Sequence, residues 1–216
     1  MGFVLAFIVF IIVVFLAGPR VKVDTTLRPL TLPPDLDQYL AEAEARFDDI
    51  VPQAEKTIIW AGEPGQKTNL SIVYLHGFSA TRQETAPLSD KLAAALGANL
   101  FYTRFTGHGR TGPALGQATV NDWLNDTIEA LEIGRRIGEK VIIIGVSTGG
   151  TAATWLATQP HLDDVLALIL ISPNFAPADS HSEILTWPWG EQIARLVLGS
   201  ESEWEPVNEL HGLYWT

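Results

Sequence analysis

The sequence predicts an α/β fold with a mostly parallel, doubly wound sheet, and three observations support this prediction. The first is a β-branched run at residues 141–144, bounded by Gly145, as in a strand buried on both faces of a parallel sheet. The second is the helical stretch at residues 150–158, which follows a short glycine-rich turn and ends before Pro160. The third is the alternation of further strands and helices, which is typical of parallel sheets with right-handed crossovers.

The chain begins with an uninterrupted apolar run at residues 3–17, closed by Gly18 and Pro19. With its flanking glycines this run makes a helix about 25 Å long, just short of a hydrocarbon core. A signal peptide would need a basic residue before the run and a small residue where Phe15 stands. A helix buried in the core would show a polar face, which this run lacks. The sequence therefore predicts a single uncleaved transmembrane anchor over residues 1–20.

Basic residues give the expected orientation of this anchor. Arg20, Lys22 and Arg28 follow the apolar run, and no Lys or Arg precedes it. The positive-inside rule then predicts a single-pass membrane protein whose catalytic body lies in the cytoplasm. Residues 21–34 are marked by prolines and predict an extended linker.

Between residues 35 and 175 the hydrophobic pattern alternates between helical and strand-like spacing. The first helix carries acidic residues on its solvated face. Thr119 with Asp122 matches a helix-start signature, and apolar residues continue after it at helical spacing. In chain order the predicted elements are a helix over 35–50, strands over 57–61 and 70–75, a helix over 86–96, a strand over 99–104, a helix from Thr119, the strand and helix described above, and a strand over 165–171.

After residue 175 the pattern changes, because residues 184–215 are helical or irregular in spacing and hold four of the seven Trp residues. The sequence therefore predicts an α/β core over residues 35–175 and the start of a helical cap over residues 176–216. Trp side chains in such a cap serve packing or acyl binding, and the sequence leaves both open.

Composition narrows the classes of function. The chain has 216 residues with a formal net charge of −11, and no basic stripe is present to bind nucleic acid. It has no Cys, which excludes disulfides, thiolate metal sites and a Cys nucleophile. We expect no cofactor and no metal, and the oligomeric state is left open.

The motif that carries chemistry is G-V-S-T-G at residues 145–149. Because it lies between a predicted strand and a predicted helix, it has the context of a nucleophile elbow, which lifts Ser147 above the sheet edge. The following helix would direct its positive end at the same place. Ser147 is therefore the predicted nucleophile.

Two further motifs, H-G-F at residues 76–78 and G-H-G at residues 107–109, follow earlier strands. Together with the serine motif they resemble the α/β-hydrolase superfamily, especially its monoglyceride lipase, carboxylesterase and serine aminopeptidase-like branch. The resemblance covers about residues 57–175. It implies that the backbone N–H groups of Phe78 and Thr148 form an oxyanion hole. His76 and His108 are expected to shape their loops and not to act as the catalytic base.

The same resemblance implies a triad acid and a His after later strands. Only one strand is predicted after Ser147, and Asp163 and Asp164 precede it, at the opposite end of the sheet. Asp179 with His181, or His211, are the remaining candidates, and no strand end presents them. We expect the chain to be the N-terminal two-thirds of a hydrolase, ending within its cap, without the triad acid and His and with negligible activity of its own. The alternative is a degenerate, non-catalytic member.

The predicted function is a membrane-anchored serine hydrolase that cleaves carboxylic esters, as an esterase or a monoglyceride-type lipase. Its substrate would be a small-molecule ester, with a lipid-derived ester suggested by the anchor and the aromatic cap, and its substrate-binding residues are unknown. Two alternatives stay open. One is a membrane-tethered α/β-hydrolase-like scaffold without turnover, and the other is a peptidase or thioesterase of the same fold.

Overall fold

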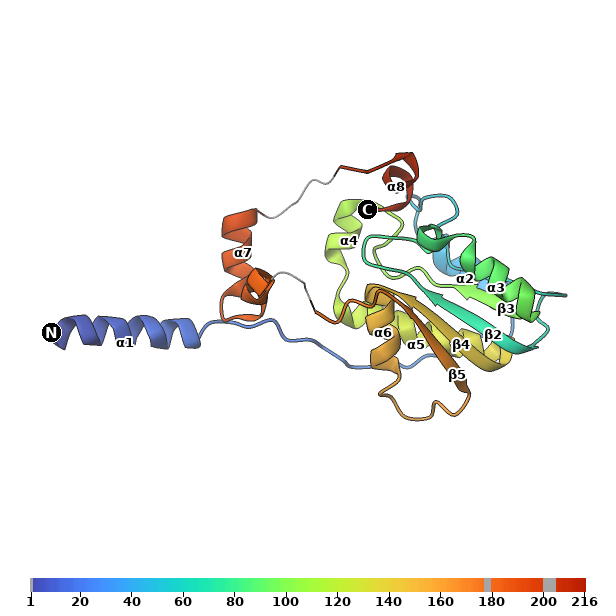
Figure 1. The fold of residues 1–216 in the computed structure, drawn as a ribbon, viewed down its shortest axis with the longest axis horizontal. Coiled ribbons are helices and arrows are strands. Elements are labelled where there is room, and N and C mark those ends of the chain that lie inside the picture. Colours follow the sequence, from blue (N-terminus) through green and yellow to red (C-terminus); the bar gives the residue numbers. More distant parts are fainter. Residues whose placement is uncertain (1, 177–179, 200–204) are drawn as a thin grey trace. The chain divides into compact units, whose positions relative to one another are not determined.

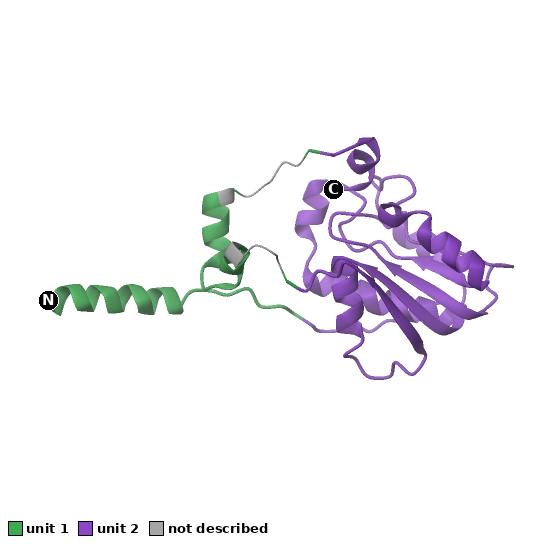
Figure 2. Cartoon of the chain, in the orientation of Figure 1, with its two compact units in different colours: residues 1–24, 176–205 green, residues 25–175, 206–216 purple. Residues whose placement is uncertain are grey.

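The computed structural model describes residues 2–176, 180–199 and 205–216. The chain divides into two compact units, residues 1–24 with 176–205 and residues 25–175 with 206–216 (Figure 2). The second unit contains the sheet and the predicted nucleophile. The domain boundaries predicted at residues 20, 34 and 175 stay predictions.

The second unit is built on a five-stranded sheet with the strand order β1-β3-β2-β4-β5 (Figure 1). Strands β2 to β5 run parallel to their neighbours, and β1 pairs antiparallel with β3, so the sheet is mixed. The order places β4, which leads to Ser147, between two parallel neighbours. The strands are β1 (Thr57–Ile59), β2 (Thr68–Leu75), β3 (Asn99–Tyr102), β4 (Gly138–Val146) and β5 (Val165–Ile171).

Helices pack on both faces of this sheet, as the doubly wound prediction requires. One buried cluster joins the strands to α2, α5 and α6, and a second joins their other face to α3. The α-helices are α1 (Gly2–Leu16), α2 (Leu36–Glu44), α3 (Leu88–Leu96), α4 (Gly112–Gln117), α5 (Val120–Ile137), α6 (Thr148–Leu156), α7 (Gly190–Leu198) and α8 (Glu209–Tyr214). Two 3₁₀ helices are η1 (Arg82–Thr85) and η2 (Ser180–Thr186).

The helix start predicted at Thr119 is confirmed as a capping box. The Thr119 hydroxyl accepts a hydrogen bond from the Asp122 N–H at 3.2 Å, and the Asp122 carboxylate accepts one from the Thr119 N–H at 3.0 Å. These two bonds satisfy donors that a helix start leaves without intrahelical acceptors. The cap sets the beginning of α5, the long helix that packs beneath β2 and β4.

The predicted transmembrane anchor over residues 1–20 is not supported. Helix α1 has 15 residues, which is about 22 Å, against a hydrocarbon core of about 30 Å. Within the described residues, no helix combines the length and the apolar character needed to cross a membrane. The helix ends before Gly18 because Pro19 disfavours helical backbone at the residue that precedes it.

Other elements also differ from the predictions, among them the strand predicted over residues 99–104, which ends at Tyr102. The helix predicted over residues 35–50 ends at Glu44, whose carboxylate is buried against Arg104. The strand predicted over residues 57–61 ends at Ile59. In addition, α4 follows the G-H-G loop without having been predicted, since its six residues are too few to show helical periodicity.

Candidate active site

Ser147 occupies the sharp turn between β4 and α6. Its backbone has φ 49° and ψ −114°, a conformation that a residue with a side chain adopts only under strain. The turn is held by the Ser147 N–H, which donates to the Ile171 carbonyl at 3.0 Å, and by the Ser147 carbonyl, which accepts from Thr151 and Asn174 at 3.1 Å each. The neighbouring strand β5 and the following helix therefore both fix the strained turn, as expected of a nucleophile elbow.

The glycines of the serine motif are required by close backbone contacts. A Cβ at Gly149 would lie 2.1 Å from the Leu75 carbonyl oxygen, and one at Gly145 would lie 2.6 Å from the Gly149 carbonyl oxygen. Neither contact is possible without moving backbone, so the spacing G-x-S-x-G follows from the packing of β4, α6 and the end of β2.

The H-G-F loop lies directly beside this elbow. A Cβ at Gly77 would lie 3.3 Å from the Ser147 Cβ. Among the described residues, the Phe78 N–H has no hydrogen-bond acceptor, and the Thr148 N–H opens helix α6, where intrahelical acceptors are lacking. The structure thus brings the Gly77–Phe78 loop to Ser147. The oxyanion-hole role of Phe78 and Thr148 stays a prediction.

Both ring nitrogens of His76 are hydrogen-bonded to backbone groups. Its Nδ1 lies 2.9 Å from the Gly77 carbonyl, and its Nε2 accepts a hydrogen bond from the Phe105 N–H at 2.9 Å. Because Nε2 is the acceptor, Nδ1 carries the proton and donates to Gly77. Complete burial lowers the pKa of His76 well below its ordinary value. No ring nitrogen is left for Ser147, which agrees with the expected loop-shaping role.

His108 is the centre of an aromatic cluster. Its ring lies 5.9 Å from that of Phe78 and 5.4 Å from that of Trp123, both in edge-to-face geometry. Its Nδ1 lies 3.3 Å from the Thr106 carbonyl, and its Nε2 is buried without a hydrogen-bond partner in the described part of the chain. Burial lowers the pKa of His108 to about 4, so the ring is neutral at physiological pH.

The remaining triad candidates do not meet Ser147 in the described residues. Asp164 lies just before β5, whereas Ser147 follows the last residue of the parallel strand β4, so the two residues are at opposite ends of the strands. Asp164 forms an ion pair with Arg135 at 2.6 Å. His211 in α8 accepts from the Val207 N–H at 3.1 Å. Asp179 and the side chain of His181 lie outside the described residues. No hydrogen bond joins a described histidine to the Ser147 hydroxyl.

One carboxylate beside the elbow was not anticipated from the sequence. Glu84 in η1 accepts hydrogen bonds from the Gly77 N–H at 2.7 Å and from the Tyr74 hydroxyl at 3.0 Å. Its position depends on a turn that brings residue 84 back to residue 77. Neither helical nor strand periodicity indicates such a turn. The only signal in the sequence is that Glu84 follows the glycine of the H-G-F motif by seven residues.

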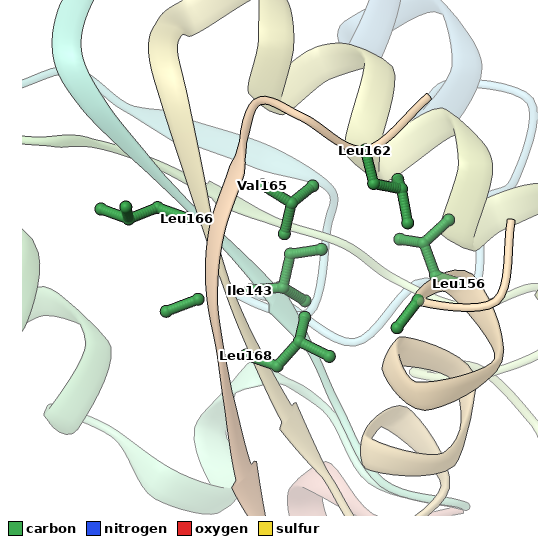
Figure 3. A pocket seen from close by; sticks show the side chains of 8 residues that line it. Ile143, Leu156, Leu162, Val165, Leu166 and Leu168 are labelled. Carbon is green, nitrogen blue, oxygen red and sulfur yellow. The ribbon is translucent and has the colours of Figure 1, made fainter. Parts of the chain in front are cut away.

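An apolar cavity of about 320 Å³ lies between the first half of β5 and the end of α6 (Figure 3). The side chains of Ile143, Leu156, Leu162, Val165 and Leu168 lie around it. Ser147 follows the opposite end of β4 and does not line this cavity. The cavity is therefore no part of the candidate active site.

The mixed sheet, the strained serine after β4 and the adjacent glycine loop define the class of protein, an α/β hydrolase. Residues 66–208 match the family model Hydrolase_4, described as serine aminopeptidase, S33. This match covers more than half of the chain, and the protein belongs to that family. The predicted resemblance to the α/β-hydrolase superfamily is thereby confirmed.

Two curated relatives are lipases. The chain is 26% identical over 157 residues to a thermostable monoacylglycerol lipase of Bacillus sp. (strain H-257), covering 71% of this chain and 60% of the lipase. It is 27% identical over 120 residues to the sn-1-specific diacylglycerol lipase ABHD11 of Danio rerio, covering 54% of this chain and 36% of that protein. The chain thus spans 60% or less of the length of these relatives.

A solved structure supports the fold. It comes from work on LipS and LipT, two metagenome-derived lipolytic enzymes, and superimposes with a TM-score of 0.54. The match has 23% sequence identity and covers 62% of this chain and 52% of the other. At this identity the likeness concerns the α/β-hydrolase fold alone.

Proposed function

We propose that this protein is a serine hydrolase that cleaves carboxylic esters through an acyl-enzyme on Ser147. The observation that carries the proposal is the strained backbone of Ser147, φ 49° and ψ −114°, held between β4 and α6. Such strain persists only where surrounding contacts enforce it, and it occurs preferentially at functional sites. The family match supports hydrolysis as the reaction class.

The proposed reaction has two steps. The Ser147 Oγ attacks the ester carbonyl, a C–O bond to the leaving alcohol breaks, and the alcohol takes up a proton. Water then attacks the acyl-enzyme, which releases the carboxylic acid and restores the serine hydroxyl. The first step needs a base for the Oγ proton, and no described histidine contacts this hydroxyl.

Backbone amides would stabilise the negative charge of each tetrahedral intermediate. The N–H groups of Phe78 and Thr148 lie on the two segments that meet at Ser147, and they need no reorganisation during the reaction. The N-terminus of α6 adds its positive dipole end at the same point. These features favour an oxyanion and fit acyl transfer.

For the substrate, we propose a glycerol ester of a fatty acid. Both curated relatives are acylglycerol lipases by name. In addition, the Phe78 side chain is 54% exposed beside the elbow, with Trp123 and His108 supporting its ring. An exposed aromatic surface next to the nucleophile favours an apolar acyl chain.

Membrane attachment through the N-terminal apolar residues, with the catalytic body in the cytoplasm, is also part of the proposal. It is supported by α1, which has no buried residue and whose Phe3 is 96% exposed. Apolar side chains on all faces of a helix favour an apolar partner. Flotation with phospholipid vesicles tests this point, and loss of flotation on deleting residues 2–24 is the expected result.

The proposed reaction is tested with Ser147→Ala in the protein at the full length of its reading frame. Turnover of p-nitrophenyl butyrate and of a monoacylglycerol should fall by at least about 10³-fold, because the covalent step is lost. Thr158→Ala, an exposed site beyond the C-terminus of the same helix, serves as the matched control. A variant that kept most of its ester turnover would show that Ser147 is not the nucleophile.

The family description favours one second candidate, a serine aminopeptidase. The same elbow and amides would serve an amide substrate, since both reactions pass through a tetrahedral intermediate. Aminoacyl p-nitroanilides assayed beside the esters decide between the two. A fluorophosphonate that fails to label Ser147 in the full-length protein would instead favour a non-catalytic scaffold.

A further inference from the structure

Glu84 lies in η1 with its carboxylate turned toward the end of β2. Its Oε1 accepts from the Gly77 N–H at 2.7 Å and from the Tyr74 hydroxyl at 3.0 Å. None of the ion pairs in the described residues includes Glu84. The hydrogen bonds of this largely buried carboxylate therefore come from neutral donors.

The second carboxylate oxygen of Glu84 lies close to Gly77, as the Ser147 side chain does. The position that a Cβ would take at Gly77 lies 2.9 Å from Glu84 Oε2 and 3.3 Å from Ser147 Cβ. Glu84, the glycine loop and the serine side chain thus meet around a single point. A side chain at residue 77 would displace this arrangement, which explains the glycine there.

Glu84 and His76 restrain the two peptide groups on either side of Gly77, the second of which carries the Phe78 N–H. Glycine has more backbone freedom than other residues, so Gly77 alone would let the next amide reorient. Its N–H is held by Glu84 at 2.7 Å, and its carbonyl is held by His76 Nδ1 at 2.9 Å. Because that carbonyl and the Phe78 N–H share one planar peptide unit, both sides of the hinge are restrained.

Burial raises the pKa of Glu84 to about 6, and the hydrogen bonds from Gly77 and Tyr74 oppose this shift. A carboxylate buried without a cation lowers stability unless it is well hydrogen-bonded. A role that needs a hydrogen-bond acceptor beside Gly77 would account for a buried Glu84 carboxylate close to the proposed reaction centre.

We propose that Glu84 is a positioning residue for the reaction at Ser147. By accepting the Gly77 N–H, it fixes the His76–Gly77 peptide, which is one side of the Gly77 hinge, while His76 holds the Gly77–Phe78 peptide on the other side, so that the Phe78 N–H points to the developing oxyanion. The inference deepens the proposed function and rests on it. The role requires a hydrogen-bond acceptor and not a charge, because the contact that restrains the loop is the Gly77 N–H bond.

Kinetics with three variants of the full-length protein test this role. Glu84→Gln retains an acceptor and should keep kcat within about threefold, whereas Glu84→Ala should lower kcat about 10- to 100-fold with KM nearly unchanged. This loss is smaller than that of an oxyanion donor itself, which is about 10²–10³-fold. Gln83→Ala, whose side chain points to Gln53, is the matched control and should resemble the wild type.

Amide hydrogen exchange, followed by NMR, gives a measure that does not depend on turnover. The Gly77 amide should exchange about tenfold faster or more in Glu84→Ala, and at nearly the wild-type rate in Glu84→Gln. Equal exchange in all variants would overturn the proposal. So would a loss of kcat that follows only the fraction of folded protein, measured by circular dichroism.

The two proposals fail in different ways. If the wild type and Ser147→Ala show the same ester turnover, the proposed function is wrong, and the exchange rates still decide whether Glu84 holds the loop. If Ser147→Ala abolishes turnover while Glu84→Ala keeps the wild-type kcat, the serine mechanism stands and the positioning role of Glu84 is wrong.

Discussion

At the scale of single residues, Ser147 and the histidines around it show how the site combines strain with neutral buried groups. His76 and His108 are both buried, and burial lowers the pKa of each. Their imidazoles shape the loops after β2 and β3 while remaining uncharged. The loops around Ser147 therefore contain buried imidazoles whose protonation would destabilise the folded protein.

This arrangement predicts acid sensitivity at His108. Its pKa is about 4 in the folded protein and about 6.5 in an unfolded chain. Above pH 6.5 the His108 ring is neutral in both the folded and the unfolded protein, so the free energy of unfolding has its full value. As the pH falls toward 4, only the unfolded chain gains the proton, so stability declines by about 2–3 kcal/mol.

The measurement is urea unfolding of the wild type and His108→Phe at pH 7.5 and pH 4.5. On acidification, the free energy of unfolding of the variant should fall by about 2 kcal/mol less than that of the wild type, because the Phe ring cannot be protonated. His161→Asn changes an exposed histidine and serves as the control. The same loss on acidification in the wild type and His108→Phe would contradict this prediction.

The residue scale also shows what the sequence could predict about the site. The elbow was predictable because its strand, serine and helix are contiguous, and the glycines report their packing locally. Glu84 was not, since its role depends on the fold of η1 against the end of β2. The buried partner of Glu44 was equally hidden, because Arg104 lies 60 positions away.

At the scale of elements, the Glu44–Arg104 ion pair connects α2 to the loop after β3. Glu44 accepts from Arg104 Nε at 2.7 Å and from Nη2 at 2.9 Å, and Arg104 Nη1 donates to the His108 carbonyl at 3.0 Å. Both side chains are buried. The pair therefore joins α2 to the G-H-G loop.

Glu44→Ala should lower the free energy of unfolding by about 3–5 kcal/mol, because it leaves a buried guanidinium without its partner. Glu44→Met with Arg104→Met should recover part of this loss by removing both charges. Glu191→Ala, in an exposed pair with Arg195, should cost less than about 1 kcal/mol. Chemical denaturation measures all three, and an equal effect at Glu44 and Glu191 would contradict the prediction.

The elements that were predicted well are those with strong local signals. Strand β5 was predicted with its observed bounds, and α5 was predicted from its capping box. By contrast, α2 ends at Glu44 although apolar spacing continues to Ile50, and the Glu44 side chain pairs with Arg104 in the loop after β3. Tertiary contacts of this kind cannot be read from periodicity.

At the scale of the whole molecule, the described core is confined to one of the two units. The buried clusters include no residue before Leu36, and Leu32 packs against one of them from the preceding segment. Helix α1 has no buried residue. The other unit, residues 1–24 with 176–205, has contacts of its own. In one of them the Trp189 backbone N–H donates a hydrogen bond to the Pro19 carbonyl at 2.9 Å.

This division predicts that deleting residues 2–24 leaves the sheet unit intact. Its midpoint of thermal unfolding should change by less than about 2 °C, since no contact in the buried clusters is lost. The deletion also removes an exposed apolar helix, so the protein should elute as a smaller species without detergent in size-exclusion chromatography.

Deleting residues 2–32 provides the matched comparison. It also removes Arg28, which pairs with Asp122 at 2.5 Å, and Leu32, which packs against the core. A loss of about 1–2 kcal/mol should lower the midpoint by about 2–8 °C. Calorimetry on both deletion variants measures the two midpoints of thermal unfolding. If the shorter deletion lowers the midpoint as much as the longer one, residues 2–24 stabilise the sheet unit and the two units do not unfold independently.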